Sequence, residues 1–222
     1  MAFPTTGLLD NFNRATEDPL GNGTWSGPIR ATNGQMKVGS GGSANAITRS
    51  AGTPGQSYWS VATFGPDSEV YATISTVPGN GDYVYLYARI VNPNTAGLDG
   101  YAMVMIKQAG DDIWQIRRID DSAETVLGAN ATQELASGES MGFEIIGSTL
   151  TAYRKSAGVW SSVLSRTDAT YSAAGYIGIG SATTVAIEDD FSGGTVVAAG
   201  AAAKPGHGAL LSGFRNQVIQ RV

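Results

Sequence analysis

Apolar and polar side chains alternate along most of the chain, with the period of a β-strand rather than that of a helix. Clear examples are the segments 57–64 (SYWSVATF), 68–77 (SEVYATISTV) and 100–108 (GYAMVMIKQ). Short segments rich in Gly, Ser, Asn and Asp separate these runs, and such segments form turns. About twelve strands at a spacing of roughly ten residues predict an all-β, antiparallel, two-sheet sandwich.

The segment 82–91 (DYVYLYARIV) has two different faces if the alternation is strict. The aliphatic face carries Val84, Leu86, Ala88 and Ile90. The aromatic face carries Tyr83, Tyr85, Tyr87 and Arg89. A row of tyrosines can stack against a sugar ring, because each has an apolar body and a polar tip. The alternative is that the row is buried between the sheets or under a loop, since tyrosine is in any case a good strand former.

The first expected strand (GLLDNFNR) resembles the last (AIEDDFSGG). Each places an Asp two residues before a Phe, which gives the pairs Asp10 with Phe12 and Asp189 with Phe191. Similar burial patterns alone would explain the likeness. We favour the more specific interpretation that the two strands pair and close the domain near residue 195.

Several motifs, in this order, resemble concanavalin A-like jelly-roll domains of the lectin, glucanase and laminin-G type. They are LLDNFNRATEDPLGNGTWS, YVYLYARIVN with GYAMVMIKQ and WQIRRI, FEIIGSTLTAYRKSAGVWSSV, GYIGIG and DDFSGG. The match covers roughly residues 7–194. The resemblance implies two curved antiparallel sheets of six or seven strands, a concave sheet that often binds carbohydrate, and relatives in phage tail and capsid proteins.

Composition removes several classes of function. The net charge is −5 with no long run of either sign, which disfavours nucleic acid as a partner. There is no cysteine, and no stretch of about 18 apolar residues that would span a membrane. The N-terminus lacks the pattern of a secretory signal, so we expect synthesis in a host cytoplasm.

Catalytic chemistry is not expected. A glycosidase needs two carboxylates facing one cleft. Glu144 has no acidic partner two or four residues further on, whereas alternation places Glu188 and Asp190 on one face of the closing strand. That pair is the nearest approach to a catalytic site, but it lies in the closing strand, where we favour turn capping and edge solubility as its explanation. His207, the single histidine, lies in a Gly-rich segment that does not fix its geometry.

Calcium is the one cofactor that the sequence leaves open. Hard cations bind several oxygen atoms, and laminin-G and lectin relatives often bind calcium at a sheet rim. Three pairs have the right chemistry, namely Asp111 with Asp112, Asp120 with Asp121, and Asp10 with Asp189. Adjacent aspartates in turns are, however, commonly turn formers with solvated side chains.

The composition changes after residue 194. We expect a jelly-roll sandwich at 1–194, a flexible Ala/Gly linker at 195–208 and an anchoring segment at 209–222. From residue 195 onward there are bases but no acids. Bulky apolar side chains on a free tail lower solubility, so we expect them to dock on a neighbouring subunit. The candidate docking residues are Leu210, Leu211, Phe214, Arg215, Val218, Ile219 and Arg221.

Three functional hypotheses follow. The first is a non-enzymatic virion protein, a capsid decoration or tail module, held to other virion subunits or to its own copies by the C-terminal segment. The second is a free lectin-type domain that binds a surface glycan, with Tyr83, Tyr85 and Tyr87 as the candidate residues. The third is a glycoside hydrolase that uses Glu188 and Asp190. The first two are compatible with each other.

Overall fold

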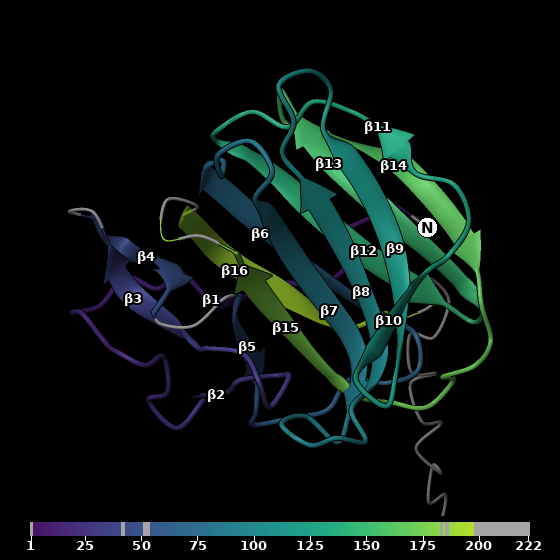
Figure 1. Ribbon diagram of the computed structural model, residues 1–222, viewed down its shortest axis with the longest axis horizontal. Coiled ribbons are helices and arrows are strands. Elements are labelled where there is room, and N and C mark those ends of the chain that lie inside the picture. Colours follow the sequence, from purple (N-terminus) through teal and green to yellow (C-terminus); the bar gives the residue numbers. More distant parts are fainter. Residues whose placement is uncertain (1, 41–42, 51–53, 183, 185–186, 198–222) are drawn as a thin grey trace, which may run out of the picture.

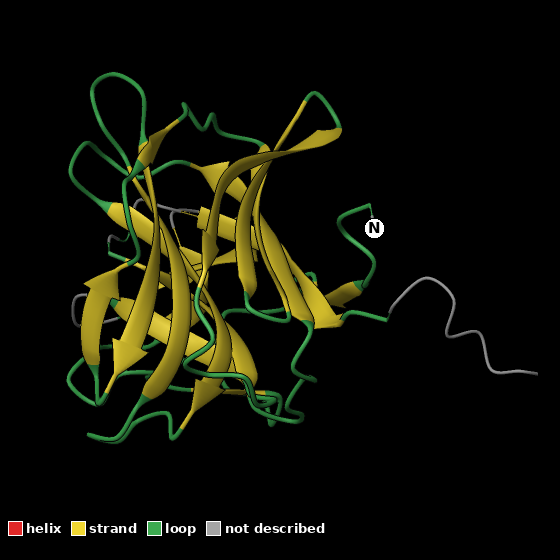
Figure 2. Ribbon diagram, turned by 90° about the vertical axis from the view of Figure 1, so that its right-hand side faces the viewer, coloured by secondary structure: helices red, strands yellow, loops and turns green. Residues whose placement is uncertain are grey.

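The computed structural model describes residues 2–40, 43–50, 54–182, 184 and 187–197 of the chain. Two antiparallel sheets face each other in these residues, and no helix occurs among them (Figure 2). The expected all-β sandwich is therefore confirmed. Within the same residues, nothing could cross a membrane as a helix.

Sheet A has eight strands, seven of them along one path and β1 (Leu8–Asp10) paired beside β16 (Figure 1). In spatial order the path is β14 (Val159–Thr167), β13 (Thr149–Ser156), β12 (Glu139–Ile146), β6 (Ser68–Thr76), β16 (Ile187–Thr195), β4 (Ser43–Arg49) and β3 (Met36–Ser40). The three neighbours β12, β13 and β14 are consecutive hairpin strands, whereas β6 and β16 lie far from them in sequence. Sheet A therefore joins the start, the middle and the end of the sandwich.

Sheet B also has eight strands, with β11 (Ala131–Thr132) paired beside β9. Its path is β10 (Ala123–Val126), β9 (Ile113–Asp120), β8 (Asp99–Ile106), β7 (Tyr83–Val91), β15 (Tyr176–Ser181), β5 (Gly55–Trp59) and β2 (Trp25–Ser26). The sheets are larger than the six or seven strands that the resemblance implies, and the strands are more numerous than the expected twelve. Strands of two to four residues, such as β2 and β11, are too short to show alternation in the sequence.

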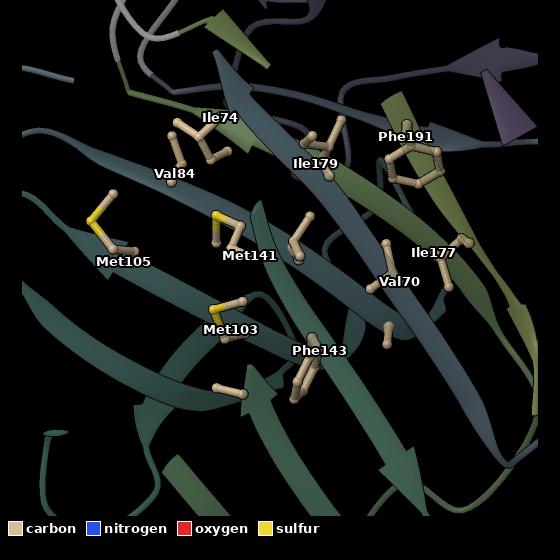
Figure 3. Packing of buried hydrophobic residues seen from close by; sticks show 14 of the residues in the cluster. Val70, Ile74, Val84, Met103, Met105, Met141, Phe143, Ile177, Ile179 and Phe191 are labelled. Carbon is tan, nitrogen blue, oxygen red and sulfur yellow. The ribbon is translucent and has the colours of Figure 1, made fainter. Parts of the chain in front are cut away.

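The main core lies between the sheets (Figure 3). Val84 points into it from sheet B, and Val70 and Ile74 point into it from sheet A. Leu86 of sheet B belongs to the same cluster. All four are fully buried. Burial of this alternate row of aliphatic side chains removes apolar area from water, which is what holds the two sheets together.

The first and last strands pair as the sequence indicates. Leu8 lies opposite Ser192, and Asp10 lies opposite Phe191. Strand β16 continues to Thr195 and Val196 is buried, so the sandwich extends slightly past the expected boundary at 194. The rest of the predicted linker and the whole anchoring segment, from residue 198 onward, lie outside the described residues.

Alternation fails at one place in β7. The register against β8 shifts between Ala88 and Val91, and Arg89 has a φ of +51°. This bulge moves the later residues by one position, because an extra residue in one strand reverses the face of those that follow. Ile90 consequently packs with the tyrosines, and Arg89 leaves them. The expectation that placed Ile90 on the aliphatic face and Arg89 on the aromatic face was wrong.

Candidate functional site

The tyrosine row lies on the outer face of sheet B, opposite the main core. Tyr83 and Tyr85 meet edge to face with ring centroids 5.1 Å apart, and Tyr85 and Tyr87 stack at 5.2 Å. Exposure falls along the row: Tyr83 is half-buried, Tyr85 is 5% exposed and Tyr87 is 1% exposed. Only the Tyr83 end of the row is therefore open to a ligand.

The segment 27–33 covers the other end of the row. Ile29 is fully buried in the same outer cluster as Tyr87. Gln56 joins the segment to the tyrosine row. Its Nε2 donates to the Tyr87 hydroxyl, and its Oε1 accepts from the backbone N–H of Arg30. Of the two alternatives to a stacking surface, burial under a loop is the one that applies to Tyr87.

A charged network borders the open end of the row. The carboxylate of Glu124 on β10 bridges two guanidinium groups, at 2.6 Å to Arg30 and 2.6 Å to Arg117. Arg30 also donates to the backbone carbonyl of Ser122. Since the side chains of Arg30, Arg117 and Glu124 are only 17% to 22% exposed, these ion pairs are shielded from water more than surface pairs are.

Amide groups extend the network along the face of β9. Arg117 Nε donates to Gln115 Oε1 at 2.9 Å, and Gln115 Nε2 donates to Asn130 Oδ1 at 3.1 Å. The Arg117 guanidinium also lies 5.9 Å from the centroid of the Tyr85 ring. Burial raises the pKa of Tyr83 and of Tyr85, and the charge of Glu124 adds to the effect, so both phenols stay neutral.

The arrangement combines a tyrosine ring with planar groups that both donate and accept hydrogen bonds. Such groups suit ligands with several hydroxyls, because guanidinium, amide and carboxylate groups each contact two neighbouring oxygen atoms. Alternation in WQIRRID places Gln115 and Arg117 on one face, which is a signal that sequence reasoning did not use. Arg30 and Glu124 are 94 residues apart, and no local pattern joins them.

No protein-family model and no curated protein matches the chain. Solved structures do match it in fold. The carbohydrate-binding module CBM66 from Bacillus subtilis has a TM-score of 0.54 at 18% identity, over 76% of this chain and 91% of its own. The VIP36 exoplasmic/lumenal domain in its Ca²⁺/Man3GlcNAc-bound form has a TM-score of 0.57 at 11% identity, over 82% and 88%.

A protein of unknown function with a galectin-like fold from Bacillus subtilis also matches, with a TM-score of 0.53 at 13% identity over 82% of this chain and 96% of its own. The chain has the fold of a concanavalin A-like lectin-type domain. The resemblance found in the sequence motifs is thus confirmed at the level of fold.

At least one carboxylate in each of the three candidate aspartate pairs already has protein partners. Among the described residues, no three Asp, Glu, His or Cys side chains gather closely enough to hold a metal ion. Donors already engage the carboxylates. Arg14 and Trp25 Nε1 contact Asp10, Tyr171 and Arg118 contact Asp120, and two backbone N–H groups donate to buried Asp112.

The expected pairing of Glu188 with Asp190 on one face was wrong. The register of β16 shifts between Asp189 and Ser192, and Asp190 has a φ of +50°. Glu188 lies opposite Ile74 and is fully buried, whereas Asp190 is exposed. Burial raises the pKa of Glu188 well above its usual range, and contact with the Ser181 hydroxyl offsets this only in part. A carboxyl group in the core cannot reach a substrate.

Another carboxylate does partner Glu144, although not from its own strand. Glu69 on β6 lies directly opposite Glu144 on β12. The N-terminal segment covers the pair, since the backbone N–H groups of Thr5 and Thr6 donate to Glu69 Oε1. Glu69 is fully buried and Glu144 is 9% exposed, so the pair is closed to substrate in the described structure.

Proposed function

We propose that this lectin-type domain is a non-catalytic module that binds glycans on the outer face of sheet B. The binding surface consists of the exposed edge of Tyr83 with Gln115, Arg117 and Glu124. The observation that carries the proposal is the network in which Glu124 joins Arg117 and Arg30 beside an open tyrosine ring. The carbohydrate-binding module CBM66 and the Man3GlcNAc-bound VIP36 domain, which share the fold, support it.

The chemistry favours a neutral saccharide. The network pairs the carboxylate of Glu124 with guanidinium groups, so the surface offers donors and acceptors without a strong field of one sign. The groups are held in place before the ligand arrives, and this lowers the entropic cost of binding. The apolar face of a sugar ring would lie against Tyr83, and its hydroxyls would contact Gln115 and Arg117.

Isothermal titration with soluble oligosaccharides tests this proposal. We expect Tyr83→Ala and the double variant Gln115→Ala/Arg117→Gln each to weaken binding by about tenfold or more, which is about 1.4 kcal/mol. Tyr176→Ala is the matched control, because Tyr176 is a half-buried tyrosine of the same outer cluster that packs on Tyr58 instead. Binding that survives both site variants, or no binding to any oligosaccharide, would refute the proposal.

A structural calcium ion remains a separate proposal for this domain. The support is that the VIP36 domain of the same fold has been solved in Ca²⁺-bound forms. The test is thermal unfolding with calcium and with a chelator. A rise in melting temperature with calcium would support a bound ion, and identical curves would rule it out.

We also propose that residues 209–222 anchor the domain to other virion subunits or to further copies of itself, which would place the chain in a virion. The support is in the sequence, where Leu211, Phe214 and Val218 combine with Arg215 and with an absence of acids. Deletion of 203–222 is the test, with oligomer size and incorporation into assembled particles as the readouts. Unchanged assembly would exclude the anchor.

A further inference from the structure

A second polar pocket lies on the opposite side of the sandwich, on the outer face of sheet A. Its volume is about 390 Å³. The lining residues are Pro4, Leu8, Tyr71, Thr73, Ser140, Lys155, Trp160, Asp190 and Ser192. None of them belongs to the surface proposed on sheet B, so the two regions face away from each other across the core.

Aromatic side chains build one wall of the pocket, and Phe3 fixes them. The ring of Phe3 stacks on Tyr153 with centroids 4.1 Å apart and an interplanar angle of 2°. It also meets Trp160 and Tyr71 edge to face, at 4.9 Å and 5.8 Å. Trp160 therefore has a fixed position while its own side chain is still half-exposed toward the pocket.

Gly142 provides the space that this packing needs. A Cβ atom at Gly142 would lie 2.4 Å from Cζ of Phe3 and 3.1 Å from Cζ3 of Trp160. Any larger residue would displace Phe3 and loosen the aromatic wall. Phe3 and Gly142 are thus positioning residues for Trp160 and do not themselves line the pocket.

Hydroxyl groups form the floor, and opposite charges stand at its two sides. Across the strands, Trp160 pairs with Lys155, Lys155 with Ser140, and Ser140 with Thr73. Thr73 Oγ1 and Ser140 Oγ lie 3.3 Å apart. Beyond Thr73 comes β16, where the bulge with its positive φ brings Asp190 to the pocket. Bulges commonly redirect a side chain near a functional site.

The two charged groups are available to a ligand. The structure gives neither Lys155 Nζ nor the Asp190 carboxylate a hydrogen bond or an ion pair with any described residue, although Lys155 Nζ lies 5.8 Å from the Trp160 ring centroid. An anionic ligand would be repelled by Asp190, and a cationic one by Lys155. A neutral ligand with many hydroxyls satisfies both.

We infer that this pocket is a second saccharide-binding site, independent of the surface on sheet B. A pyranose ring lies against Trp160, its hydroxyls donate to Asp190 and accept from Lys155, and Ser140 and Thr73 contact the remaining oxygens. Together with the proposed surface on sheet B, this pocket lets one domain hold two glycan chains on opposite faces. This makes it able to crosslink glycans as a monomer, with the gain in avidity that two linked sites provide.

Titration of the ¹⁵N-labelled full chain tests the inference with three defined probes, mannotetraose, maltotetraose and chitotetraose. The indole N–H signal of Trp160 is the readout, assigned by its loss in Trp160→Phe. We expect one probe at millimolar concentration to shift this signal saturably, and Asp190→Ala and Lys155→Ala to weaken the effect by about tenfold. Lys37→Ala is the control, because Lys37 is a surface lysine on β3 of the same sheet.

The double variant Gln115→Ala/Arg117→Gln separates the two sites. If the pocket binds sugar, the Trp160 signal responds in this variant as in the unaltered chain, whatever happens on sheet B. If the oligosaccharides bind only through sheet B and the Trp160 signal does not move, the second site does not exist while the proposed function stands. A Trp160 shift that Asp190→Ala and Lys155→Ala leave intact also refutes the pocket.

Discussion

Glu69 and Glu144 face each other across the β6–β12 pair, beneath the N-terminal segment. Glu69 Oε1 accepts from Thr5 N at 2.6 Å and from Thr6 Oγ1 at 2.7 Å, and Glu144 Oε2 accepts from the Tyr153 hydroxyl at 3.0 Å. Burial raises the pKa of Glu144, and the neighbouring Glu69 carboxylate raises it further. The Glu144 carboxyl therefore keeps its proton to a higher pH than an exposed glutamate does.

Glu144 should therefore make the stability of the domain depend on pH. Because its folded-state pKa is raised, its contribution is fully present below the unfolded pKa of about 4.3 and disappears as the pH rises through the folded pKa. Glu144→Gln stays neutral and should gain stability relative to the unaltered chain as the pH increases. Urea unfolding across a pH series measures the difference, with Glu134→Gln at an exposed position as the control. A constant difference at every pH would contradict this explanation.

Phe3 should contribute more to the free energy of unfolding than the other residues of the N-terminal segment. Phe3→Ala removes a side chain that is 8% exposed and contacts three aromatic rings, so we expect a loss of about 2–3 kcal/mol. Leu8→Ala is the matched control, because Leu8 lies in the same segment but is 55% exposed, and its loss should stay within about 0.5 kcal/mol. Chemical denaturation compares them. Equal losses would mean that the aromatic packing contributes nothing specific.

Arg89, in the bulge of β7, should be highly sensitive to substitution. Its guanidinium is 1% exposed and donates to the backbone carbonyls of Pro66, Tyr171 and Gly147 at 2.6–2.8 Å. Arg89→Ala removes a buried side chain together with its three hydrogen bonds, and we expect it to cost about 3–5 kcal/mol. Lys37→Ala breaks the more exposed ion pair with Asp18 and should cost about 1 kcal/mol or less. Similar unfolding midpoints for the two variants would refute the central role of Arg89.

Glu188 is expected to lower stability at alkaline pH. It lies in the core opposite Ile47 and Ile74, and burial raises its pKa well above the usual range. Its stabilising contribution is therefore present at low pH and is lost as the pH rises through the folded pKa. Glu188→Met should increase the free energy of unfolding by about 1–2 kcal/mol near pH 8 and by less near pH 5. The melting temperature should rise accordingly. Glu188→Ala leaves a cavity and should not have this effect. A Met variant that melts earlier at both pH values would contradict the prediction.

The main features of the fold could be predicted because local sequence patterns determine them. Alternation identified Val84, Leu86 and Ala88 as core residues, and all three are buried. The repeated Asp-x-Phe motif predicted the pairing of the first strand with the last, which the register of Asp10 with Phe191 confirms.

The departures from these patterns were not predictable, because their causes lie in other parts of the chain. The bulges at Arg89 and Asp190 reverse the faces of their strands, and the sequence around them shows no break in alternation. Alternation placed Tyr83 opposite the aliphatic row, but it did not show whether that face was open or buried. That Tyr87 would be covered, and that Arg30 would reach Glu124, depends on the path of the segment 27–33.

Antiparallel pairing of β1 with β16 brings residues 6–10 beside residues 191–194. A force that pulls the two ends of the sandwich apart would load the β1–β16 pair at the end where both termini lie. The contacts between the two strands would then break one after another rather than together. The N-terminal segment that covers Glu69 would detach first and separate Phe3 from Tyr153, while the two sheets stayed intact. Tension would thereby uncover the acidic pair and loosen the Trp160 wall before the domain itself unfolded.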